Sequence, residues 1–366
     1  MGFNCGIVGL PNVGKSTLFN ALTESAAAEA ANYPFCTIDP NNGRVAVPDL
    51  RLAKIASIAN SATTIPAHME FTDIAGLVAG ASKGEGLGNQ FLAHIRDCHA
   101  IAHVLRCFTD DSISHVTGAI NPVADAELVE TELLLADLES VLKRLDGLTK
   151  KARGGDKTAK AELTLLEKIK TGLDRGTPAR HCPDLTDDEK LTLPKLQLLT
   201  TKPILYVCNV AESDAASGNP HTEAIAKKAQ AEGADMVTVS AAIEAEISRL
   251  PHDERTSFLN DLGLKETGLA RLIQAGYRLL GLISFFTAGE KEARSWTIPN
   301  GTTASQAAGV IHTDFQRGFI RAETIGYDDY VACGGESAAA TAGKMRAEGA
   351  DYQVKDGDVM HFRFNV

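Results

Sequence analysis

Long hydrophobic runs are missing from this sequence, and no stretch approaches the ~18 apolar residues of a membrane span. The first stretch, MGFNCGIVGL, contains no basic residue, which argues against a secretory signal peptide. Gly6 stands where an N-myristoylation signal has serine or threonine. These absences argue against membrane-spanning and lipid-anchored classes. They predict a cytoplasmic protein that has no membrane partner.

Cysteine motifs and an excess of positive charge are also missing. The seven cysteines are scattered without a CxxC spacing, as is typical of thiols in a reducing cytoplasm. The formal net charge of −11 argues against a protein that coats nucleic acid with its whole surface, and no DNA partner is expected. Any contact with RNA therefore requires a local basic patch. The length of 366 residues predicts two or three domains.

A phosphate-binding motif is present near the N-terminus. FNCGIVGLPNVGKSTLFNAL (3–22) predicts a short strand, a loop and a helix, and it contains Gly9-x-x-x-x-Gly14-Lys15-Ser16. This is the full P-loop pattern in the context that it requires, and a chance glycine turn is the weaker alternative. Glycines let backbone N–H groups surround a β-phosphate, and the helix points its positive end at the same anion. The residues expected to bind a nucleotide here are Asn12, Val13, Gly14, Lys15, Ser16 and Thr17.

Two downstream features complete a candidate metal site. Lys15 is expected to bridge the β- and γ-phosphates, which makes it a candidate catalytic residue, and the Ser16 hydroxyl is expected to ligate Mg²⁺. MEFTDIAGL (69–77) predicts a strand that ends at Asp73-x-x-Gly76. A carboxylate at this position holds the water shell of the metal, and the glycine N–H can turn to the γ-phosphate. Asp73 is therefore a candidate metal-site residue and Gly76 a candidate nucleotide-binding residue.

The segment NYPFCTID (32–39) predicts a first switch. Thr37 could close over the metal, and an ordinary loop threonine is the alternative. Leu77 stands where Ras-like enzymes place the glutamine that orients the attacking water. Because leucine cannot hydrogen-bond water, hydrolysis is expected to be very slow or to use another group. Oxidation of Cys36 could disturb the closure of Thr37, although a buried inert thiol is the simpler interpretation.

A candidate base-recognition loop follows the predicted strand PILYVCN. GTP-binding switch proteins have Asn-Lys-x-Asp here, whose carboxylate binds two donors on guanine, whereas this sequence has NVAE (209–212). Adenine presents an amine donor at N6 and an acceptor at N1, so a carboxylate is attracted to one atom and repelled by the other. We expect Glu212 to turn aside, and Asn209 with main-chain groups near Val210 to meet the N6 amine. The pattern favours adenine and leaves guanine open.

The stretch SAAIE (240–244) follows the next predicted strand. It resembles the Ser-Ala loop that backs the base in the same proteins. Ser240 and Ala241 are therefore expected to line the nucleotide site.

Together these motifs resemble the Obg-like ATPase family, in its YchF branch. GLPNVGKST, NYPFCTIDPN, DIAGLVAGASKGEGLGNQFL, QAGYRLL, HTDFQRGFIRAETI and YQVKDGDVMHFRFNV carry the resemblance, which extends from residue 1 to 366. It implies an α/β fold: a Ras-like or Obg-like P-loop NTPase domain with a mostly parallel sheet, an inserted α-helical hairpin and a C-terminal β-grasp TGS domain. It also implies an Mg²⁺-dependent ATPase that associates with the ribosome and acts in translation or stress control.

The resemblance implies one further catalytic residue. The proposed water-positioning histidine of the family lies in a loop after the third strand, and by position it corresponds to His115 in DDSISHV. An imidazole with a pKa near ~6.5 can orient water or stabilise charge on the phosphoryl group. His94, His99 and His103 are rival histidines, and on residue type alone each is more often structural.

An insertion separates Asp73 from Asn209. From Glu127 the chain is strongly helical, and a second helix is expected at 159–173 after a break at ARGGDK (152–157). Apolar residues in the first helix alternate at spacings of four and three, which is a coiled-coil seam. The seam consists of Leu134, Leu138, Val141, Leu145 and Leu148. These features predict a hairpin arm, and the capping box Thr186-x-x-Glu189 predicts a third short helix.

The charge of the arm is polarised toward its tip. Residues 143–170 contain nine Lys or Arg against four Asp or Glu. A basic tip on a projecting arm suits contact with ribosomal RNA phosphates, and a solvated helix surface is the alternative.

From about Ile283 the sequence predicts short strands separated by glycine turns, with a helix from Ser305 to His312. This pattern predicts a small β-grasp unit, which the resemblance makes a TGS domain that could contact ribosomal RNA. A packing and docking domain is the alternative. The predicted division is a nucleotide-binding domain at 1–126 and 199–282, an arm at 127–198, and a TGS domain at 283–366.

Three functions remain open at this point. The first is an ATP-hydrolysing regulatory switch that works on the ribosome, and the second is a GTP-dependent translation-associated GTPase. The third is a nucleotide-bound RNA- or ribosome-binding module with negligible turnover, which Leu77 makes reasonable. Nucleotide preference separates the first two, and turnover that is lost in Lys15→Ala excludes the third.

Overall fold

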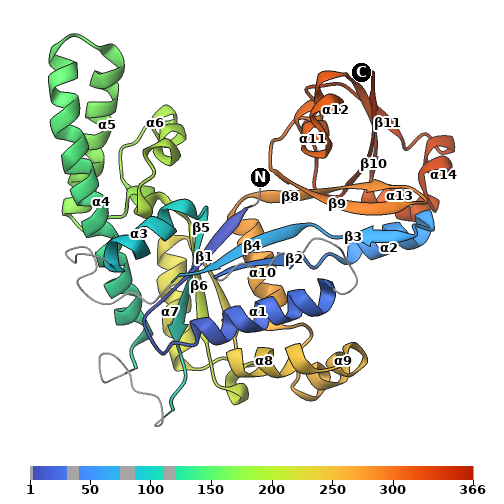
Figure 1. Ribbon diagram of the computed structural model, residues 1–366, viewed down its shortest axis with the longest axis horizontal. Helices are drawn as coiled ribbons and strands as arrows, with labels where there is room; N and C mark the ends of the chain where they lie inside the picture. Colours follow the sequence, from blue (N-terminus) through green and yellow to red (C-terminus); the bar gives the residue numbers. More distant parts are fainter. Residues whose placement is uncertain (1–2, 31–40, 75–86, 111–119, 366) are drawn as a thin grey trace.

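A computed structural model describes residues 3–30, 41–74, 87–110 and 120–365, and its first layer is a six-stranded sheet (Figure 1). The strand order is β2-β4-β1-β5-β6-β7. The bounds are β1 Asn4–Val8, β2 Asn42–Ala46, β4 His68–Asp73, β5 Ala100–Arg106, β6 Ile204–Asn209 and β7 Asp235–Val239. β2 is antiparallel to β4, and the other neighbours are parallel. The predicted α/β class with a mostly parallel sheet is confirmed.

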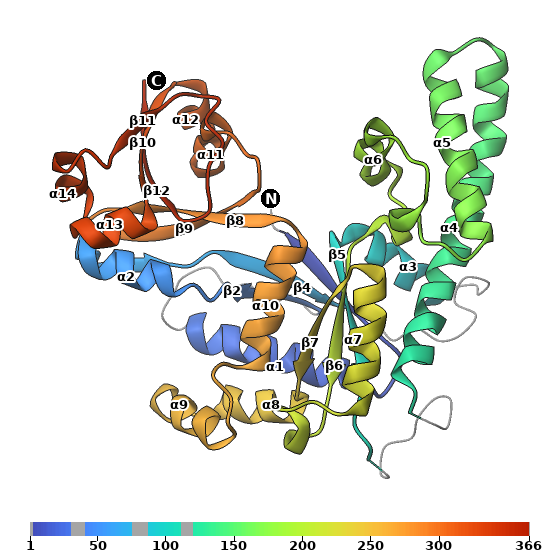
Figure 2. The same ribbon diagram turned by 180° about the vertical axis from the view of Figure 1, so that it is seen from behind.

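Helices cover both faces of this sheet (Figures 1 and 2). On one face lie α1 (Lys15–Ala30), α8 (Ala241–Arg249) and α10 (Gly268–Leu279). On the other lie α3 (Leu87–Asp97), the start of α4 (Pro122–Arg153) and α7 (Pro220–Glu232). Two short helices, η4 (Glu212–Asp214) and α9 (His252–Asp261), complete this layer.

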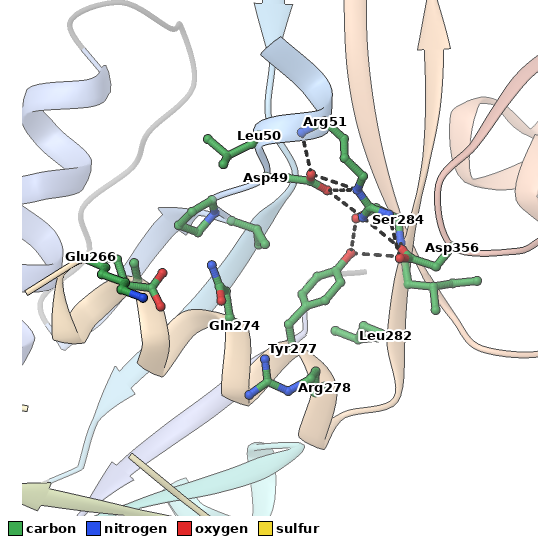
Figure 3. A pocket seen from close by; sticks show the side chains of 15 residues that line it. Asp49, Leu50, Arg51, Glu266, Gln274, Tyr277, Arg278, Leu282, Ser284 and Asp356 are labelled. Carbon is green, nitrogen blue, oxygen red and sulfur yellow. Dashed lines mark hydrogen bonds and ion pairs between the residues drawn. The ribbon is translucent and has the colours of Figure 1, made fainter. Parts of the chain in front are cut away.

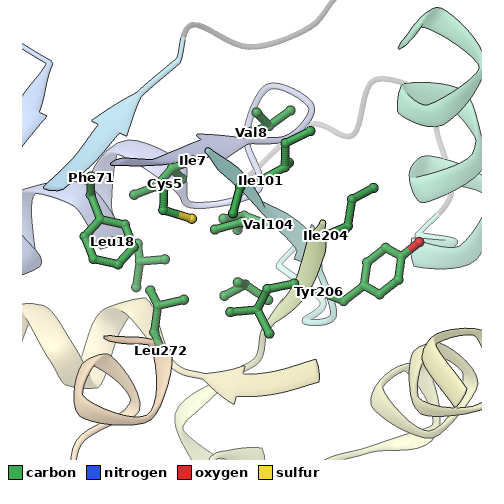
Figure 4. Close-up of a cluster of buried hydrophobic side chains, with 14 of the residues drawn as sticks. Cys5, Ile7, Val8, Leu18, Phe71, Ile101, Val104, Ile204, Tyr206 and Leu272 are labelled. Carbon is green, nitrogen blue, oxygen red and sulfur yellow. The ribbon is translucent and has the colours of Figure 1, made fainter. Parts of the chain in front are cut away.

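The core of this layer explains the continuous apolar runs of β1, β5 and β6, which are buried on both faces. Figure 4 shows the enclosed side chains, among them the fully buried Ile7, Phe71 and Leu272. Because the strands are fixed by this core, the carboxyl ends of the parallel strands meet at one edge of the sheet. In open α/β sheets that edge is where ligands bind.

A helical hairpin projects from the sheet (Figure 2). It consists of α4 and α5 (Lys157–Asp174). Helix α4 begins at Pro122, earlier than the expected Glu127, because the side chain of Asn121 accepts a hydrogen bond from Ala124 N–H and proline suits the first turn. The predicted seam is confirmed, since Val141 is buried in a cluster against which the other four seam leucines pack.

Four short helices return the chain from the arm to the sheet. They are η1 Ala179–His181, α6 Asp187–Thr192, η2 Leu193–Leu196 and η3 Leu199–Thr201. The predicted capping box of Thr186 and Glu189 is confirmed. At the root of the arm, the fully buried Asp137 accepts hydrogen bonds of 2.6–2.8 Å from Leu199 N–H and from the N–H and hydroxyl of Thr200.

A second six-stranded sheet has the order β11-β10-β12-β8-β9-β3. Its C-terminal strands are β8 Leu282–Ala288, β9 Glu292–Pro299, β10 Phe319–Gly326, β11 Arg346–Glu348 and β12 Asp358–Phe364. The helices that lie between these strands in the chain are α11 Ala304–Ile311, α12 Thr313–Arg317, α13 Tyr327–Cys333 and α14 Glu336–Thr341. We call the strands and helices from β8 to β12 the C-terminal layer. The helix expected at Ser305–His312 is α11, which begins and ends one residue earlier.

The second sheet also contains a segment from the N-terminal half of the chain. β3 (Thr63–Ile65) pairs in parallel with β9, and α2 (Leu50–Ala59) buries Leu52 and Ile55 in the core of the C-terminal strands. Residues 50–65 thus pack with the C-terminal strands, although the sequence grouped them with the nucleotide-binding domain. A short amphipathic helix does not reveal which of two cores it packs against.

Neither a membrane-spanning helix nor a disulfide bond is found within the ranges that the structure describes. Among the described residues, no helix is both long enough and apolar enough to cross a lipid bilayer. The six cysteines in these ranges are unpaired, and five of them are buried. Cys36 lies outside the described residues.

Candidate functional site

The P-loop runs from the end of β1 into the first turn of α1. Gly14 has a φ of +94°, which favours glycine, and a Cβ there would lie 2.2 Å from Asn209 Nδ2. A Cβ at Gly9 would lie 2.4 Å from the carbonyl oxygen of Val104 on β5. Each glycine of the motif is therefore required by a close approach, and Gly14 is also required by its backbone conformation.

Lys15, Ser16 and Asp73 meet at the start of α1. Lys15 is 7% exposed, and its Nζ donates to the carbonyl oxygen of Leu10 at 3.2 Å. Ser16 Oγ donates to Asp73 Oδ2 at 3.3 Å. Burial lowers the pKa of Lys15 and raises the pKa of Asp73, and the attraction between the two charges opposes both shifts.

These oxygen atoms fit a divalent cation. Asp73 Oδ1 is buried and has no hydrogen-bond partner among the described residues. A buried oxygen of this kind calls for an explanation, and a bound ion is one. Hydroxyl and carboxylate oxygens are the groups that Mg²⁺ takes from proteins, often through its water shell. The third expected metal residue, Thr37, lies outside the described residues.

A pocket of about 630 Å³ opens beside the P-loop. Its walls come from the P-loop, the loop after β5, the end of β6 and the start of α8. The lining residues are Asn12, Gly14, Thr17, Phe108, Thr109, Asp110, Asn209, Val210, Ala211, Glu212, Ser213, Ala241 and Ala242. The predicted phosphate loop and the predicted base loop thus border one cavity, whose volume is typical of small-ligand sites.

Asn209 ties two walls of this pocket together. Its side chain is buried, Nδ2 donates to the carbonyl oxygen of Val13 at 2.9 Å, and Oδ1 accepts from Ala241 N–H at 2.9 Å. These partners fix the orientation of the amide. One N–H of Nδ2 and one lone pair of Oδ1 remain, so the amide can still donate to a purine ring nitrogen and accept from a purine amine. The expectation that Asn209 meets the N6 amine therefore stays a prediction, and the observed bonds show that Asn209 also connects two walls of the pocket.

The other predicted base-site residues differ in burial and in hydrogen bonding. Val210 is buried, and its N–H donates to the carbonyl oxygen of Val239 at 2.9 Å. Glu212 is exposed where it lines the pocket. Ser240 precedes the first turn of α8 and is buried, and its Oγ has no partner in the described part of the chain.

Sequence reasoning missed the wall formed by Phe108, Thr109 and Asp110. These residues follow β5, and the last residue of that strand, Arg106, pairs in register with Asn209. A signal for them was available: AIAHVLRCF is a buried strand that ends with an aromatic residue, at the edge where ligands bind. Without the strand order, nothing in the sequence placed this end beside Asn209.

Three predicted residues, Gly76, His115 and Leu77, lie outside the described residues. Among the rival histidines, His103 is buried on β5, and burial lowers its pKa to about 3, so the imidazole is neutral near pH 7. His99 Nδ1 accepts a hydrogen bond from Asn4 N–H at 3.1 Å.

A second pocket of about 790 Å³ lies at the junction of the two sheets (Figure 3). On one wall Arg51 forms ion pairs with Asp49 at 2.8 Å and with Asp356 at 2.7 Å. Tyr277 OH lies 2.9 Å from Ser284 Oγ on the same wall. Because these polar groups are paired with one another and no phosphate loop is present, we assign the nucleotide site to the smaller pocket.

Comparison with known proteins gives matches over the whole chain. The chain is 57% identical to "Ribosome-binding ATPase YchF" of Escherichia coli O157:H7 and 53% identical to the protein of the same name of Bacillus subtilis (strain 168), with all of each chain covered. The solved "Structure of the Schizosaccharomyces pombe YchF GTPase" is 39% identical, covers 99% of this chain and 98% of its own, and has a TM-score of 0.89. A family model described as "50S ribosome-binding GTPase" matches residues 4–137. The model YchF-GTPase_C, "Protein of unknown function (DUF933)", matches residues 282–365.

Proposed function

The chain belongs to the YchF family, and from this premise we propose that it is an Mg²⁺-dependent ATPase that associates with the ribosome. It acts in the cytoplasm as a regulatory switch in translation or stress control. The observation that carries the proposal is the single pocket that the P-loop shares with the NVAE loop. Full-length relatives named ribosome-binding ATPases support the same activity.

Each part of the pocket takes one part of the nucleotide. The backbone of Asn12–Thr17 and the start of α1 receive the phosphates, and Lys15 stabilises the charge that develops during phosphoryl transfer. Gly76 contributes a main-chain contact to the γ-phosphate. Val210, Ser240 and Ala241 surround the base beside Asn209.

Ser16, Asp73 and Thr37 hold the metal. When bound, Mg²⁺ supplies neutralisation of the phosphate charge. His115 orients the attacking water, because Leu77 cannot do so. A test is His115→Ala, which is expected to lower kcat while leaving the affinity for ATP unchanged.

The choice of ATP over GTP rests on Glu212. Its carboxylate is one methylene longer than the aspartate that binds guanine, and it lies exposed at the pocket. GTP is the second candidate, because the solved relative is described as a GTPase. The two candidates differ in one measurable quantity, the ratio of the affinities for ATP and GTP.

The deciding experiment titrates nucleotide-free protein with ATP and GTP in Mg²⁺. We expect tighter binding of ATP, and a shift toward GTP in Glu212→Asp. Glu223→Asp, at an exposed position on α7, is the matched control and should leave the ratio unchanged. Lysine is not introduced at Val210, because that side chain is buried. Equal or tighter binding of GTP by the unaltered protein would move the GTPase function to first place.

Turnover separates the enzyme from a binding module. Phosphate release that is stimulated by ribosomes and lost in Lys15→Ala is expected. An unaltered protein with no measurable phosphate release would leave a ribosome-binding module with a structural nucleotide.

The tip of the arm is the proposed contact with ribosomal RNA. Lys150, Lys151, Arg153, Lys157 and Lys160 are exposed there, and none of them forms an ion pair within the described ranges. Cations that are not neutralised locally are available to RNA phosphates, and binding of this kind weakens as salt rises.

Neutralising the tip tests this contact. The variant Lys150→Gln, Lys151→Gln, Arg153→Gln and Lys157→Gln should co-sediment with ribosomes less well. Its salt slope should be smaller by about 0.7–0.9 for each RNA phosphate that the protein no longer neutralises. The control neutralises the exposed Lys54, Lys227, Lys265 and Lys291, which lie outside the two arm helices. Unchanged co-sedimentation of the tip variant would refute the contact.

We assign a second RNA contact to the C-terminal layer, which corresponds to the expected TGS domain. Phe315 and Phe364 stack with ring centroids 3.8 Å apart, and Phe364 is 38% exposed. Exposed aromatic rings suit stacking of unpaired RNA bases. Phe364→Ala should weaken ribosome association without changing the affinity for ATP, and an unchanged association would refute this assignment.

A further inference from the structure

Arg106 is a buried cation at the end of β5, beside the nucleotide pocket. Its side chain is 2% exposed, although burying a guanidinium is costly unless hydrogen bonds compensate. Arg106 is not among the described residues that line the pocket. The side chain therefore faces the protein around it and not the cavity.

The described contacts of Arg106 converge on the loop that follows it. Nε donates to the carbonyl oxygen of Phe108 at 3.2 Å, and Nη2 donates to the carbonyl oxygen of Asp110 at 3.1 Å. The guanidinium carbon lies 4.8 Å from the centroid of the Phe108 ring. One side chain thus holds the backbone of the loop at two points and packs on the ring between them.

The other described anchors of this loop act on Cys107. Cys107 N–H donates to the carbonyl oxygen of Asn209 at 2.8 Å, and Asn219 Nδ2 donates to the carbonyl oxygen of Cys107 at 2.7 Å. These bonds fix the start of the loop. The position of Phe108 as a wall of the pocket therefore depends on Arg106.

We propose that Arg106 is a positioning residue that holds the Phe108 ring as the surface on which the nucleotide base stacks. The proposal rests on the proposed nucleotide site and adds a determinant of base binding to it. The geometry requires arginine, since its planar fork can donate in two directions and stack on a ring at the same time. A lysine at this position has one ammonium group and cannot reproduce the fork.

The test compares a ligand that has a base with one that does not. Calorimetry measures binding of ATP and of inorganic tripolyphosphate, both in Mg²⁺, to the unaltered protein, Arg106→Lys, Phe108→Ala and the double variant. We expect Arg106→Lys and Phe108→Ala each to weaken ATP binding about tenfold, which is within the range for loss of one stacked base. Tripolyphosphate affinity should not change. The double variant should bind ATP no more weakly than Phe108→Ala, because both changes remove the same stacking surface.

Each remaining outcome overturns a specific step. Unchanged ATP affinity in Arg106→Lys, with a loss in Phe108→Ala, would refute the positioning role and leave the nucleotide site intact. Equal losses for ATP and tripolyphosphate in Arg106→Lys would also refute it, because the effect would then be on the whole site. Unchanged ATP affinity in Phe108→Ala would overturn the assignment of this pocket to the base. Losses that multiply in the double variant would mean that the two residues act independently.

Discussion

At the scale of single residues, the P-loop depends on a side chain almost two hundred positions away. Asn209 Nδ2 donates to Val13, and the space beside Gly14 is filled by the same amide. The phosphate loop and the base loop are therefore linked by one residue. A change in either loop is expected to affect both halves of the nucleotide site.

Gly14→Ala should weaken ATP binding by about tenfold or more. A residue with a Cβ is strained by about 1–2 kcal/mol in a left-handed conformation, and the new methyl group must also displace Asn209. Calorimetric titration with ATP measures the loss. The control is Gly147→Ala in the arm, where a Cβ meets no atom within 4 Å and alanine should stabilise the helix by about 0.5–1 kcal/mol. Unchanged ATP affinity in Gly14→Ala would contradict the described P-loop geometry.

Asp73→Asn should raise the Mg²⁺ concentration needed for half-maximal ATP binding by about 10–100-fold, as loss of a supporting metal-site group does. The carboxylate that the metal requires is removed, while the volume of the side chain is kept. Glu70→Gln, earlier on β4, is the control. Equal Mg²⁺ dependence in both variants would exclude Asp73 from the metal site.

The pH dependence of the same site follows from the raised pKa of Asp73. The metal binds the ionised carboxylate, so Mg²⁺-dependent affinity is present above this pKa and is lost as the pH falls through it. Because burial raises the pKa, the loss should begin at a higher pH than for an ordinary aspartate. Affinities measured across the acidic range should show this decline in the unaltered protein, and Asp73→Asn should not show it. A decline of the same size in Asp73→Asn would assign it to another group.

At the scale of elements, a buried carboxylate ties the arm to the segment that returns the chain to the sheet. Asp137 on α4 accepts three hydrogen bonds from Leu199 and Thr200 on η3. Lys202, just after η3, donates to the carbonyl oxygens of Arg96 and Cys98 at the end of α3. The segment that anchors the arm is thus also bonded to the end of α3.

Asp137→Ala should lower the free energy of unfolding by roughly 3 kcal/mol, because buried donors lose their acceptor. Urea unfolding followed by circular dichroism measures the change. Asp146→Ala, exposed on the same helix, should stay within about 0.5 kcal/mol of the unaltered protein. Similar stabilities of the two variants would show that the arm is held by other contacts.

At the scale of the whole molecule, the two layers share the segment between β2 and β4. This segment contains α2 and β3, which pack in the second sheet, while β4 ends at Asp73 in the first. Arg51 forms an ion pair with its neighbour Asp49 and a second one with Asp356 of the C-terminal segment (Figure 3). The C-terminal layer is therefore part of the support of the strand that carries the metal-site carboxylate.

A chain that ends at Gly281 should be unstable. It exposes Leu52 and Ile55 on α2, and burial of two such side chains contributes about 3–6 kcal/mol. We expect strong binding of a hydrophobic dye and a lower urea midpoint. The same truncated chain with Leu52→Gln and Ile55→Gln should bind less dye. A truncated chain as stable as the full chain would show that the layers are independent.

The sequence by itself determined the features that depend on residues close together in the chain. The P-loop pattern, Asp73 at the end of a strand and the NVAE loop each lie within a few residues, so spacing reveals them. The coiled-coil seam and the capping box were predictable for the same reason, because helix periodicity and capping are local.

Tertiary structure decided the features that depend on which distant segments meet. The strand order places Arg106 and Phe108 beside Asn209. The folded chain also brings the amide of Asn209 into hydrogen-bond distance of Val13 and Ala241. It packs α2 against the C-terminal strands and pairs β3 with the second sheet. Each of these outcomes joins residues that lie far apart in the sequence. Local sequence patterns indicate which face of a helix or strand is apolar. The tertiary structure determines which other helix or sheet covers that face.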